Sequence, residues 1–554
     1  MMKEDDLKGK KKVFFRCFVS TFFLFIFAVY LCFSPGFLSA REKDAEELNL
    51  TEENEVELSL KSVMVLALKN NLQIAFESLG PGISETEIDR EKSVYDPNLS
   101  LQFGKDRRVT QVGNFLSGAG NDSVWQQNWN LEADVKKKFV TGTSAELKVN
   151  GSDSTTDFLF QSLNPQYQGE LNLSLTQPLL RDFGIEVGKS MIKIANLNFK
   201  MSEEQFRKNV MEILYQIERY YWNLYFQIKD LEAREKSLKL AEDLLREFKI
   251  KIEAGTLAPV EIYQAEAEVA ERKQDLIVAR DLRRDTEDDL KSALNFYEKE
   301  QYWDLTIIPA DAPRPTVMKE ELMESMKEAF EYRPDYNQAK MEIEARNIMV
   351  KYTKNQVLPR VDIFGTIGTM GLGGRGSDET ADFMGGGGGF FQNLFAEKPD
   401  PWSRHWDDVA DSMASGDFYN YLIGLKIEFP LGNRFAKSQY SKAKLEAARA
   451  VTLLRDLENT VINEVREAIR QVETDTERVE AAKASLRFSQ EKLKAEEKKY
   501  EVGLSTTHDL LEFQEDLARA TSREALARAD YMKNLADLAR VKGMLLKKNN
   551  ITVN

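Results

Sequence analysis

The chain has 554 residues, with 76 Lys+Arg against 91 Asp+Glu and a formal net charge of −15. Its 42% of hydrophobic residues allow a packed core, and the acidic balance argues against a general nucleic-acid binder, which needs a basic surface. The only cysteines are Cys17 and Cys32 and the only histidines are His405 and His508, so a disulfide framework, a cysteine-based zinc site and a cysteine nucleophile are nearly excluded. We expect no metal, no cofactor and no enzymatic activity.

Residues 1–40 have the pattern of a secretory signal peptide. A lysine-rich start precedes an apolar run at 18–33, and the small residues Ser39 and Ala40 end the segment. An uncleaved membrane anchor is the alternative, although the apolar run is shorter than the about 20 residues that a spanning helix needs. Cleavage would leave a mature chain without cysteine.

Residues 41–300 are predicted to hold a helix, several strands and a long helical hairpin. In the strand that ends at Pro178, Leu171, Leu173 and Leu175 alternate with polar residues. Residues ~186–253 have helical apolar spacing and contain no proline, and ~259–298 form a return helix after a tip near Gly255. A rod of this length followed by an antiparallel return is a coiled-coil hairpin.

Residues 301–315 are a predicted linker, and 316–547 repeat the same order of elements. A helix and strands are followed by a Gly-rich loop at 369–419, a strand that ends at Pro430, and a long helix at ~434–501. The tip lies near Gly503, the return helix spans ~505–547, and a tail occupies 548–554. The glycines at 371–376 formally match a dinucleotide fingerprint, but no helix is expected after them, so a surface loop is favoured.

The two halves are related by an internal repeat. The segment from Glu253 to Ile262 resembles the segment from Glu501 to Leu510 at an offset of 248, and the same offset holds through the flanking helices. Next to the strands the offset becomes 252, because residues 181–184 are extra in the first half. An ancestral module was therefore duplicated.

The alternating strands fit either a membrane β-barrel or a half-buried sheet on a soluble core, and alternation alone does not separate them. Two strands per half would give four per chain, which cannot close around water, so several chains would have to share one barrel. Residues 126–138 and 142–150 look like an added strand pair, and the sequence leaves open whether this pair joins the barrel or decorates it.

Short motifs in this order resemble the TolC family of outer-membrane efflux channels. They are Gln177-Pro178-Leu179-Leu180, Phe429-Pro430-Leu431-Gly432, Arg333-Pro334-Asp335, Leu358-Pro359 and the two tips, of which the tip from Tyr500 to Glu512 is the closest match. The resemblance covers nearly the whole chain after residue 40.

The resemblance implies a mainly α-helical fold with membrane strands. Three identical chains would share one twelve-stranded barrel in the outer membrane, and their duplicated hairpins would form an α-barrel tunnel through the periplasm. A periplasmic adaptor and an inner-membrane transporter would dock at the closed tips, so the partners are a homotrimer, these two proteins and outer-membrane lipid, without nucleic acid.

The resemblance also assigns residues to the pore and to the docking surface. Its acidic pore ring falls on Asp509 and Glu512, with Glu261 as the first-half counterpart of Asp509 and Tyr500 just before the tip. The assigned docking residues are Gly255, Thr256, Gly503, Leu504 and Ser505, and the strand-to-helix transitions are Pro178 and Pro430.

Two readings compete with that assignment at the tip. Asp509 and Glu512 are alternatively interpreted as solvated charges on the helix face. Ser505-Thr506-Thr507 are alternatively interpreted as a cap of the return helix. Ser505 also stands where some family members carry an arginine that locks the closed state, so a latch of that kind is not expected here.

The sequence thus favours an exit duct for efflux or type I secretion that passes substrate passively. The runner-up is a periplasmic coiled-coil structural or adaptor protein without a pore. Duplicated hairpins flanked by amphipathic strands argue against that alternative, and an enzyme is a distant third.

Overall fold

A computed structural model describes residues 55–113, 122–158, 161, 163–255, 258–315, 320–376, 405–502 and 504–552. The chain divides into two units, Met1–Val56 and Glu57–Asn554. The predicted signal peptide lies outside the described residues, and the account below concerns the second unit. Across the described ranges, no helix combines the length and the apolar character that a membrane span requires.

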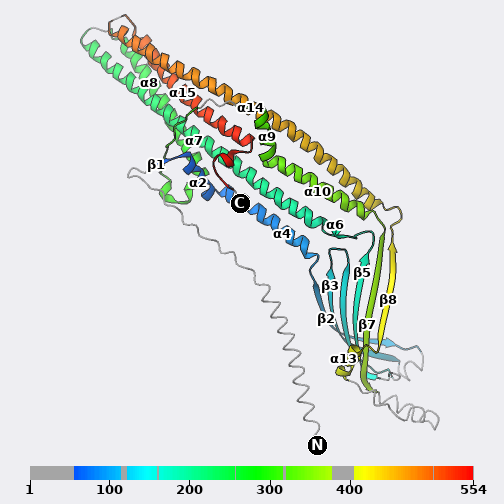
Figure 1. Cartoon of the computed structure of the whole chain (residues 1–554). Coiled ribbons are helices and arrows are strands. Elements are labelled where there is room, and N and C mark those ends of the chain that lie inside the picture. Colours follow the sequence, from blue (N-terminus) through cyan, green and yellow to red (C-terminus); the bar gives the residue numbers. More distant parts are fainter. Residues whose placement is uncertain are drawn as a thin grey trace, which may run out of the picture. The chain divides into compact units, whose positions relative to one another are not determined.

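Two helical hairpins make up most of the second unit (Figure 1). The first joins α7 (Ser190–Glu253) to α8 (Glu261–Ala293), and the second joins α14 (Arg434–Glu501) to α15 (Thr507–Val541). With 64 and 68 residues, α7 and α14 are each about 100 Å long. Both end where the apolar spacing predicts.

The return helices end earlier than predicted. α8 is followed by Asn295 and α15 by Gly543, which adopt left-handed φ values of 55° and 73°. A left-handed residue turns the chain out of the helix, and this conformation favours glycine and asparagine. The apolar spacing that suggested longer helices continues into the turns that follow.

The remaining helices are shorter, and all of them except the one at Trp406–Ser415 contact α7 or α14. They are α2 (Leu60–Asn70), α3 (Leu72–Glu77), α4 (Leu79–Ser93), α6 (Ile185–Gly188), α9 (Leu322–Tyr332), α10 (Pro334–Gln356), α13 (Trp406–Ser415) and α16 (Leu545–Lys548). α4 contacts α7, and α10 contacts both α7 and α14. The short strands β1 (Glu55–Leu58) and β6 (Thr306–Pro309) pair with one another. β1 is tied to α7 through the buried Tyr221, whose hydroxyl donates to the Leu58 carbonyl at 3.0 Å.

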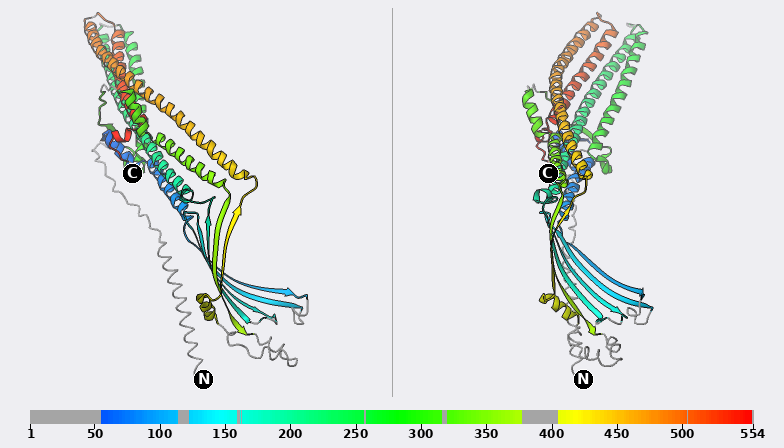
Figure 2. Two further views of the ribbon diagram at one scale, coloured as in Figure 1. Left: turned by 45° about the vertical axis from the view of Figure 1, so that its right-hand side comes forward. Right: turned by 90° about the vertical axis from the view of Figure 1, so that its right-hand side faces the viewer.

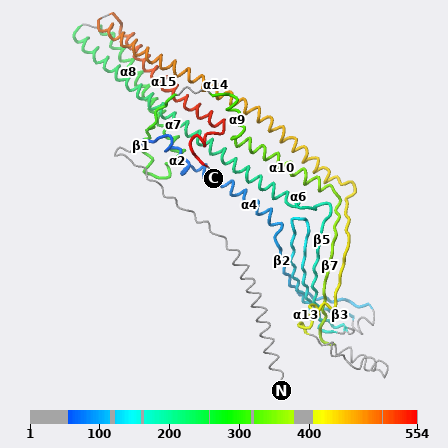
Figure 3. The backbone as a smooth tube through the Cα atoms, viewed as in Figure 1, coloured from blue at the N-terminus to red at the C-terminus, as the bar shows by residue number. Residues whose placement is uncertain are grey.

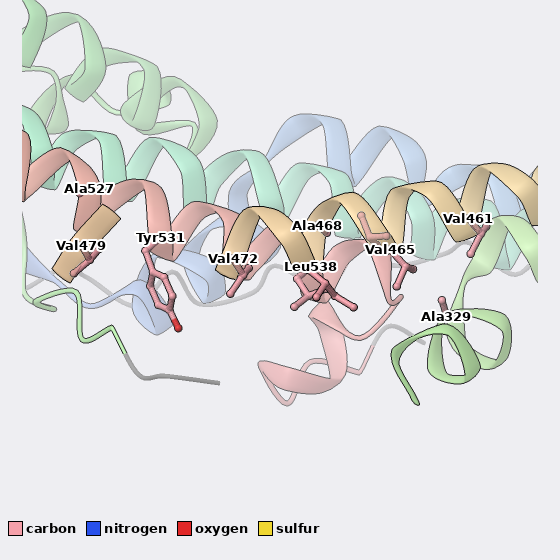
Figure 4. Packing of buried hydrophobic residues seen from close by; sticks show 11 residues of the cluster. Ala329, Val461, Val465, Ala468, Val472, Val479, Ala527, Tyr531 and Leu538 are labelled. Atoms are coloured by element: carbon pink, nitrogen blue, oxygen red, sulfur yellow. The ribbon is translucent and has the colours of Figure 1, made fainter. Parts of the chain in front are cut away.

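The second hairpin is held by a continuous apolar seam. Residues at three- and four-residue spacing on α14, among them Val461, Val465 and Val472, are buried against α15, and Tyr531 and Leu538 pack there from the other side (Figure 4). This spacing places one side of each helix against its partner, as in a coiled coil.

Six strands form one antiparallel sheet at the end of the rods opposite the hairpin tips (Figure 3). In sheet order they are β2 (Asn98–Gln111), β3 (Ser123–Lys138), β4 (Ser144–Thr156), β5 (Leu163–Pro178), β7 (Arg360–Gly376) and β8 (Tyr419–Glu428). The added pair expected at 126–138 and 142–150 is β3 and β4. The sequence left open whether this pair joins the other strands, and the structure places it inside the sheet, which has six strands in the one chain.

The sheet has one apolar and one polar face across all six strands. One cross-strand row on the apolar face consists of Leu99, Val135, Leu147, Leu173, Ile367 and Tyr421. The neighbouring row on the opposite face consists of Ser100, Asp134, Lys148, Asn172, Gly368 and Asn420. The large apolar side chains of the first row are exposed in the single chain. An apolar surface of this extent needs a lipid or protein partner.

Its composition predicted that the Gly-rich segment 369–419 is one loop, and this prediction is wrong. β7 continues to Gly376 and α13 follows at Trp406–Ser415, while 377–404 lies outside the described residues. α13 packs on the apolar face of the sheet, where a Cβ at Gly371 would collide with the Val409 backbone and one at Gly169 with the Met413 sulfur. Gly169 and Gly371 therefore leave room for α13, and residues 371–376 belong to a strand rather than to a phosphate-binding loop.

Prolines mark the change from strand to helix in both halves. Pro178 is the last residue of β5, and Pro430 follows β8. Proline donates no hydrogen bond to a ladder, which suits a strand end. After Pro430, Gly432 and Asn433 take left-handed φ values of 85° and 44° and redirect the chain into α14.

Candidate functional site

The ends of both hairpins pack into one four-helix unit (Figures 1 and 2). Its buried core draws Ala241, Leu244 and Phe248 from α7, Ala265 from α8, Leu493 from α14, and Leu510 and Leu511 from α15. Each tip is thus fixed against the other by apolar side chains, and the charged residues at the tip are held by this core.

The first tip turns at Gly255, as predicted. Gly255 has φ 73°, and its N–H donates to the Ile252 carbonyl at 2.9 Å. Thr256 and Gly503, the other two predicted turn residues, lie outside the described residues.

Asp509 belongs to a helix cap. Thr506 is the N-cap of α15: its hydroxyl accepts from the Asp509 N–H at 3.2 Å, and the Asp509 carboxylate accepts from the Thr506 hydroxyl at 2.7 Å. These Thr506 hydrogen bonds hold the pKa of Asp509 below its ordinary value. The capping alternative is confirmed for Thr506, and it leaves Asp509 ionised at neutral pH.

The other predicted pore residues lie on the same helices in different settings. Glu512 is exposed on α15, three residues after Asp509 and so on the same side of the helix. Glu261 is the first residue of α8, where no side chain caps the helix. Tyr500 packs against the tip core, with the Lys251 ammonium 4.9 Å from its ring centre, so its contacts are those of a packing residue.

Ser505 has a partner within its own hairpin. Its hydroxyl donates to the Glu496 carboxylate at 2.6 Å, and Lys499 also reaches Glu496, at 2.9 Å. The Ser505 hydrogen bond, followed by that of Lys499, lowers the pKa of Glu496. The position where some family members carry an arginine is thus used here to tie the turn to α14.

The tip surface is apolar around these polar groups. Five large apolar side chains are exposed there: Ile250 by 61%, Val260 by 67%, Tyr263 by 71%, Val502 by 69% and Leu504 by 78%. Side chains of this size rarely cluster in water without a partner. The tips therefore carry ionised carboxylates beside an exposed rim of apolar side chains, the apolar rim.

The family model described as "Outer membrane efflux protein" matches residues 142–295 and 326–544, which is more than half of the chain. The chain belongs to this family. The match includes both hairpins, β4, β5, β7 and β8, and the family consists of outer-membrane channels rather than enzymes.

Solved outer-membrane channels share the fold of this chain. The CmeC outer membrane channel of Campylobacter jejuni aligns at a TM-score of 0.60 and 15% identity, over 93% of this chain and 94% of CmeC. The MtrE outer membrane channel of Neisseria gonorrhoeae aligns at 0.58 and 16%, over 89% and 91%.

A curated relative is the alkaline protease secretion protein AprF of Pseudomonas aeruginosa, which is 27% identical over 150 residues. That match spans 26% of this chain and 31% of AprF.

One residue that the sequence analysis missed joins the hairpins of this outer membrane efflux protein. Arg272 on α8 is only 4% exposed. Its guanidinium donates to the Leu511 carbonyl at 2.8 Å, the Ser237 carbonyl at 3.1 Å and the Gln514 side chain at 3.3 Å.

The sequence does carry a signal for Arg272. The residues seven positions before and after it, Ala265 and Ala279, are both buried, so an arginine stands at an apolar position of the heptad. A charge at such a position marks a side chain with specific buried partners.

Proposed function

We propose that this chain is the outer-membrane exit duct of an efflux or type I secretion system. Three copies assemble side by side, their sheets closing into one barrel in the outer membrane and their hairpins lining a tunnel through the periplasm. Substrate crosses passively, and energy comes from an inner-membrane transporter. Residues 1–40 direct export and are removed.

The observation that carries this proposal is the continuous apolar face of the six-stranded sheet. It crosses every strand in register, while the opposite face carries ion pairs such as Lys148–Glu132 at 2.5 Å and Lys136–Glu146 at 3.3 Å. Lipid on one side and water on the other require this division. Rods about 100 Å long then extend from the barrel into the periplasm.

The pore constriction is assigned to the tip carboxylates. In a threefold assembly, copies of Asp509, Glu512 and Glu261 face one axis and attract cations. The capping hydrogen bonds favour a charged Asp509, so the ring stays negative at neutral pH. Tyr500 contributes by packing beneath the ring.

The apolar rim of the tips is the docking surface for partners. Gly255, Thr256, Gly503, Leu504 and Ser505 present the turns to a periplasmic adaptor, and the transporter approaches from the same end. Leu504 is the most exposed apolar residue of the described tip. Replacing it with Asp weakens adaptor binding in a pull-down assay, whereas Leu504→Met preserves it.

Fractionation and planar-bilayer recording test the duct. The protein should float with outer membranes and conduct ions as a detergent-resistant trimer. The double variant Asp509→Ala/Glu512→Ala should lose cation preference, whereas Glu480→Ala, which removes a carboxylate that is 68% exposed on α14, should not. Unchanged selectivity in the double variant would remove both residues from the pore.

The competing function, a periplasmic adaptor without a pore, predicts a different result. Such a protein would fractionate with the periplasm and would give no ion conductance in a planar bilayer. The exposed apolar face would then be covered by a protein partner.

A further inference from the structure

The two halves of the chain differ by a hairpin. In the second half β7 pairs directly with β8, whereas in the first half the equivalent strands β2 and β5 are separated by β3 and β4. β2, β5, β7 and β8 each connect to a helix, but β3 and β4 are joined to one another by a short turn on the side of the rods. The first half therefore contains two strands that the duplicated module does not require.

A second difference between the halves provides the seat of this hairpin. Residues 181–184 are extra in the first half, and the Gly184 N–H donates to the carbonyl of Thr141 in the β3–β4 turn at 3.1 Å. The turn fits so closely that a Cβ at Gly142 would collide with the Asp182 carbonyl. The seat is itself fixed to α10, because the Asn355 side chain accepts from the Asp182 N–H at 2.8 Å. Two separate insertions thus meet and hold one another.

The hairpin continues both faces of the sheet. Val149 on β4 pairs with Leu171 on β5, and Ala133 on β3 pairs with Leu101 on β2, all on the apolar face. Trp129 of β3 is 39% exposed on the same face, as expected of an aromatic residue near the edge of an apolar band. The opposite face of the hairpin carries the ion pairs described above. A hairpin that only decorated a barrel would have no reason to divide its side chains in this way.

The outer strands are compatible with joining another copy. Neighbouring strands alternate in direction, so the first strand, β2, and the sixth, β8, run opposite ways. Within the described chain no strand pairs with the outer edge of either one. Both are free of proline and place apolar and polar residues on the same faces as the rest of the sheet. Open edges do not persist in lipid, so β8 of one copy has β2 of the next as its partner.

From these observations we propose that three copies close a barrel of eighteen strands, six from each chain, in place of the twelve that the family resemblance implies. The proposal rests on the trimer of the proposed function and goes beyond it in strand number and width. Barrel diameter grows roughly in proportion to strand number, so the barrel is about 1.5 times as wide and about twice as large in cross-section. The membrane end of the duct therefore admits cargo bulkier than a twelve-stranded barrel passes.

Disulfide trapping in isolated outer membranes tests the place of the hairpin. The proposal predicts bonds within one chain for Val149→Cys/Leu171→Cys and for Leu101→Cys/Ala133→Cys. It predicts none for Leu101→Cys/Leu171→Cys, because three strand spacings, about 14 Å, exceed the reach of a disulfide. If the hairpin lay outside the barrel, β2 would pair with β5, and the same register would bring Leu101 to Leu171. A Leu101–Leu171 bond without the Val149–Leu171 bond would overturn the proposal.

A second set of pairs tests the trimer separately. Leu101→Cys is combined in turn with Ile423→Cys, Leu425→Cys and Ile427→Cys on β8, and one combination should give a covalent trimer. If none does and the protein behaves as a soluble monomer, the proposed function fails. If the trimer forms but the hairpin pairs do not, only the eighteen-stranded barrel fails.

The width is measured by polymer exclusion from the barrel side of a planar bilayer. Relative to a variant lacking residues 112–162 and 181–184, the full chain should admit polymers of about twice the cross-section. Equal cut-offs would contradict the proposal. If the shortened variant does not fold, the disulfide pairs decide alone.

Discussion

Removing the Arg272 side chain should loosen the tips far more than removing an exposed arginine. The Arg272→Ala variant leaves the Ser237 and Leu511 carbonyls buried without this donor, and it removes one link between α8 and α15. A hydrogen bond that involves a charged group contributes about 1.5–3 kcal/mol, so the loss of these two bonds should cost at least about 3 kcal/mol. Because about 1.4 kcal/mol corresponds to a tenfold change in an equilibrium constant, local opening at the tip should become at least about 100-fold more frequent. Arg272→Met, which fills the space without a charge, should lose less.

Amide hydrogen exchange of the protein in detergent measures this opening. Peptides that span Leu510–Gln514 and the Ser237 region should lose protection in Arg272→Ala, while peptides from the sheet stay unchanged. The matched control is Arg246→Ala on α7, because Arg246 is 72% exposed and forms a surface ion pair with Asp243 at 3.3 Å. This change should cost under about 1 kcal/mol. If the two variants exchange alike at the tip, Arg272 does not tie the hairpins together.

Three further changes probe the cap, the middle of the rods and the sheet. Thr506→Ala should lower the stability of α15 by about 1 kcal/mol. It should also abolish the acid-dependent loss of exchange protection in the first turn of α15, because the lowered pKa of Asp509 gives stability that is present above the pKa of the unfolded state and is lost as pH falls through the pKa of the folded state. An unaltered pH profile would contradict this. Burial opposes ionisation of Asp335, but Arg333 outweighs it and lowers the pKa of that carboxyl. Asp335→Asn should therefore lower the melting temperature at pH 7 and make the melting temperature less sensitive to acidification below about pH 4. An equal loss of melting temperature at pH 7 and at pH 3 would refute the linkage. Gly371→Ala forces a methyl group against α13 and should raise exchange in that helix by about tenfold, from about 1–3 kcal/mol of overpacking, whereas Gly376→Ala, which meets open space, should leave it unchanged.

The rods and the tips could be predicted because their determinants are local. A helix of 68 residues needs only its apolar spacing and the absence of proline, and Gly255 alone signals the turn. The T-x-x-D pattern of Thr506 and Asp509 is likewise a local capping signal. Such elements are specified by neighbours in the sequence, so they are visible without knowledge of the fold.

The order of the strands and the partner of Arg272 could not be predicted. Alternation assigns each residue to a face, but it does not say which strand lies beside which, because pairing joins segments as distant as Leu173 and Ile367. Glycines such as Gly371 suggest a loop by composition, and only the presence of α13 explains why a strand carries them. Arg272 stands among alanines whose partners lie on another hairpin.

The short turn between β3 and β4 makes these two strands a self-contained cassette. Because they begin and end on the side of the sheet away from the rods, they can be gained or lost during evolution without disturbing a helix. In the proposed threefold assembly, each such event alters the circumference of the barrel in steps of six strands. The diameter of the proposed barrel and the length of the rods are thus independently adjustable.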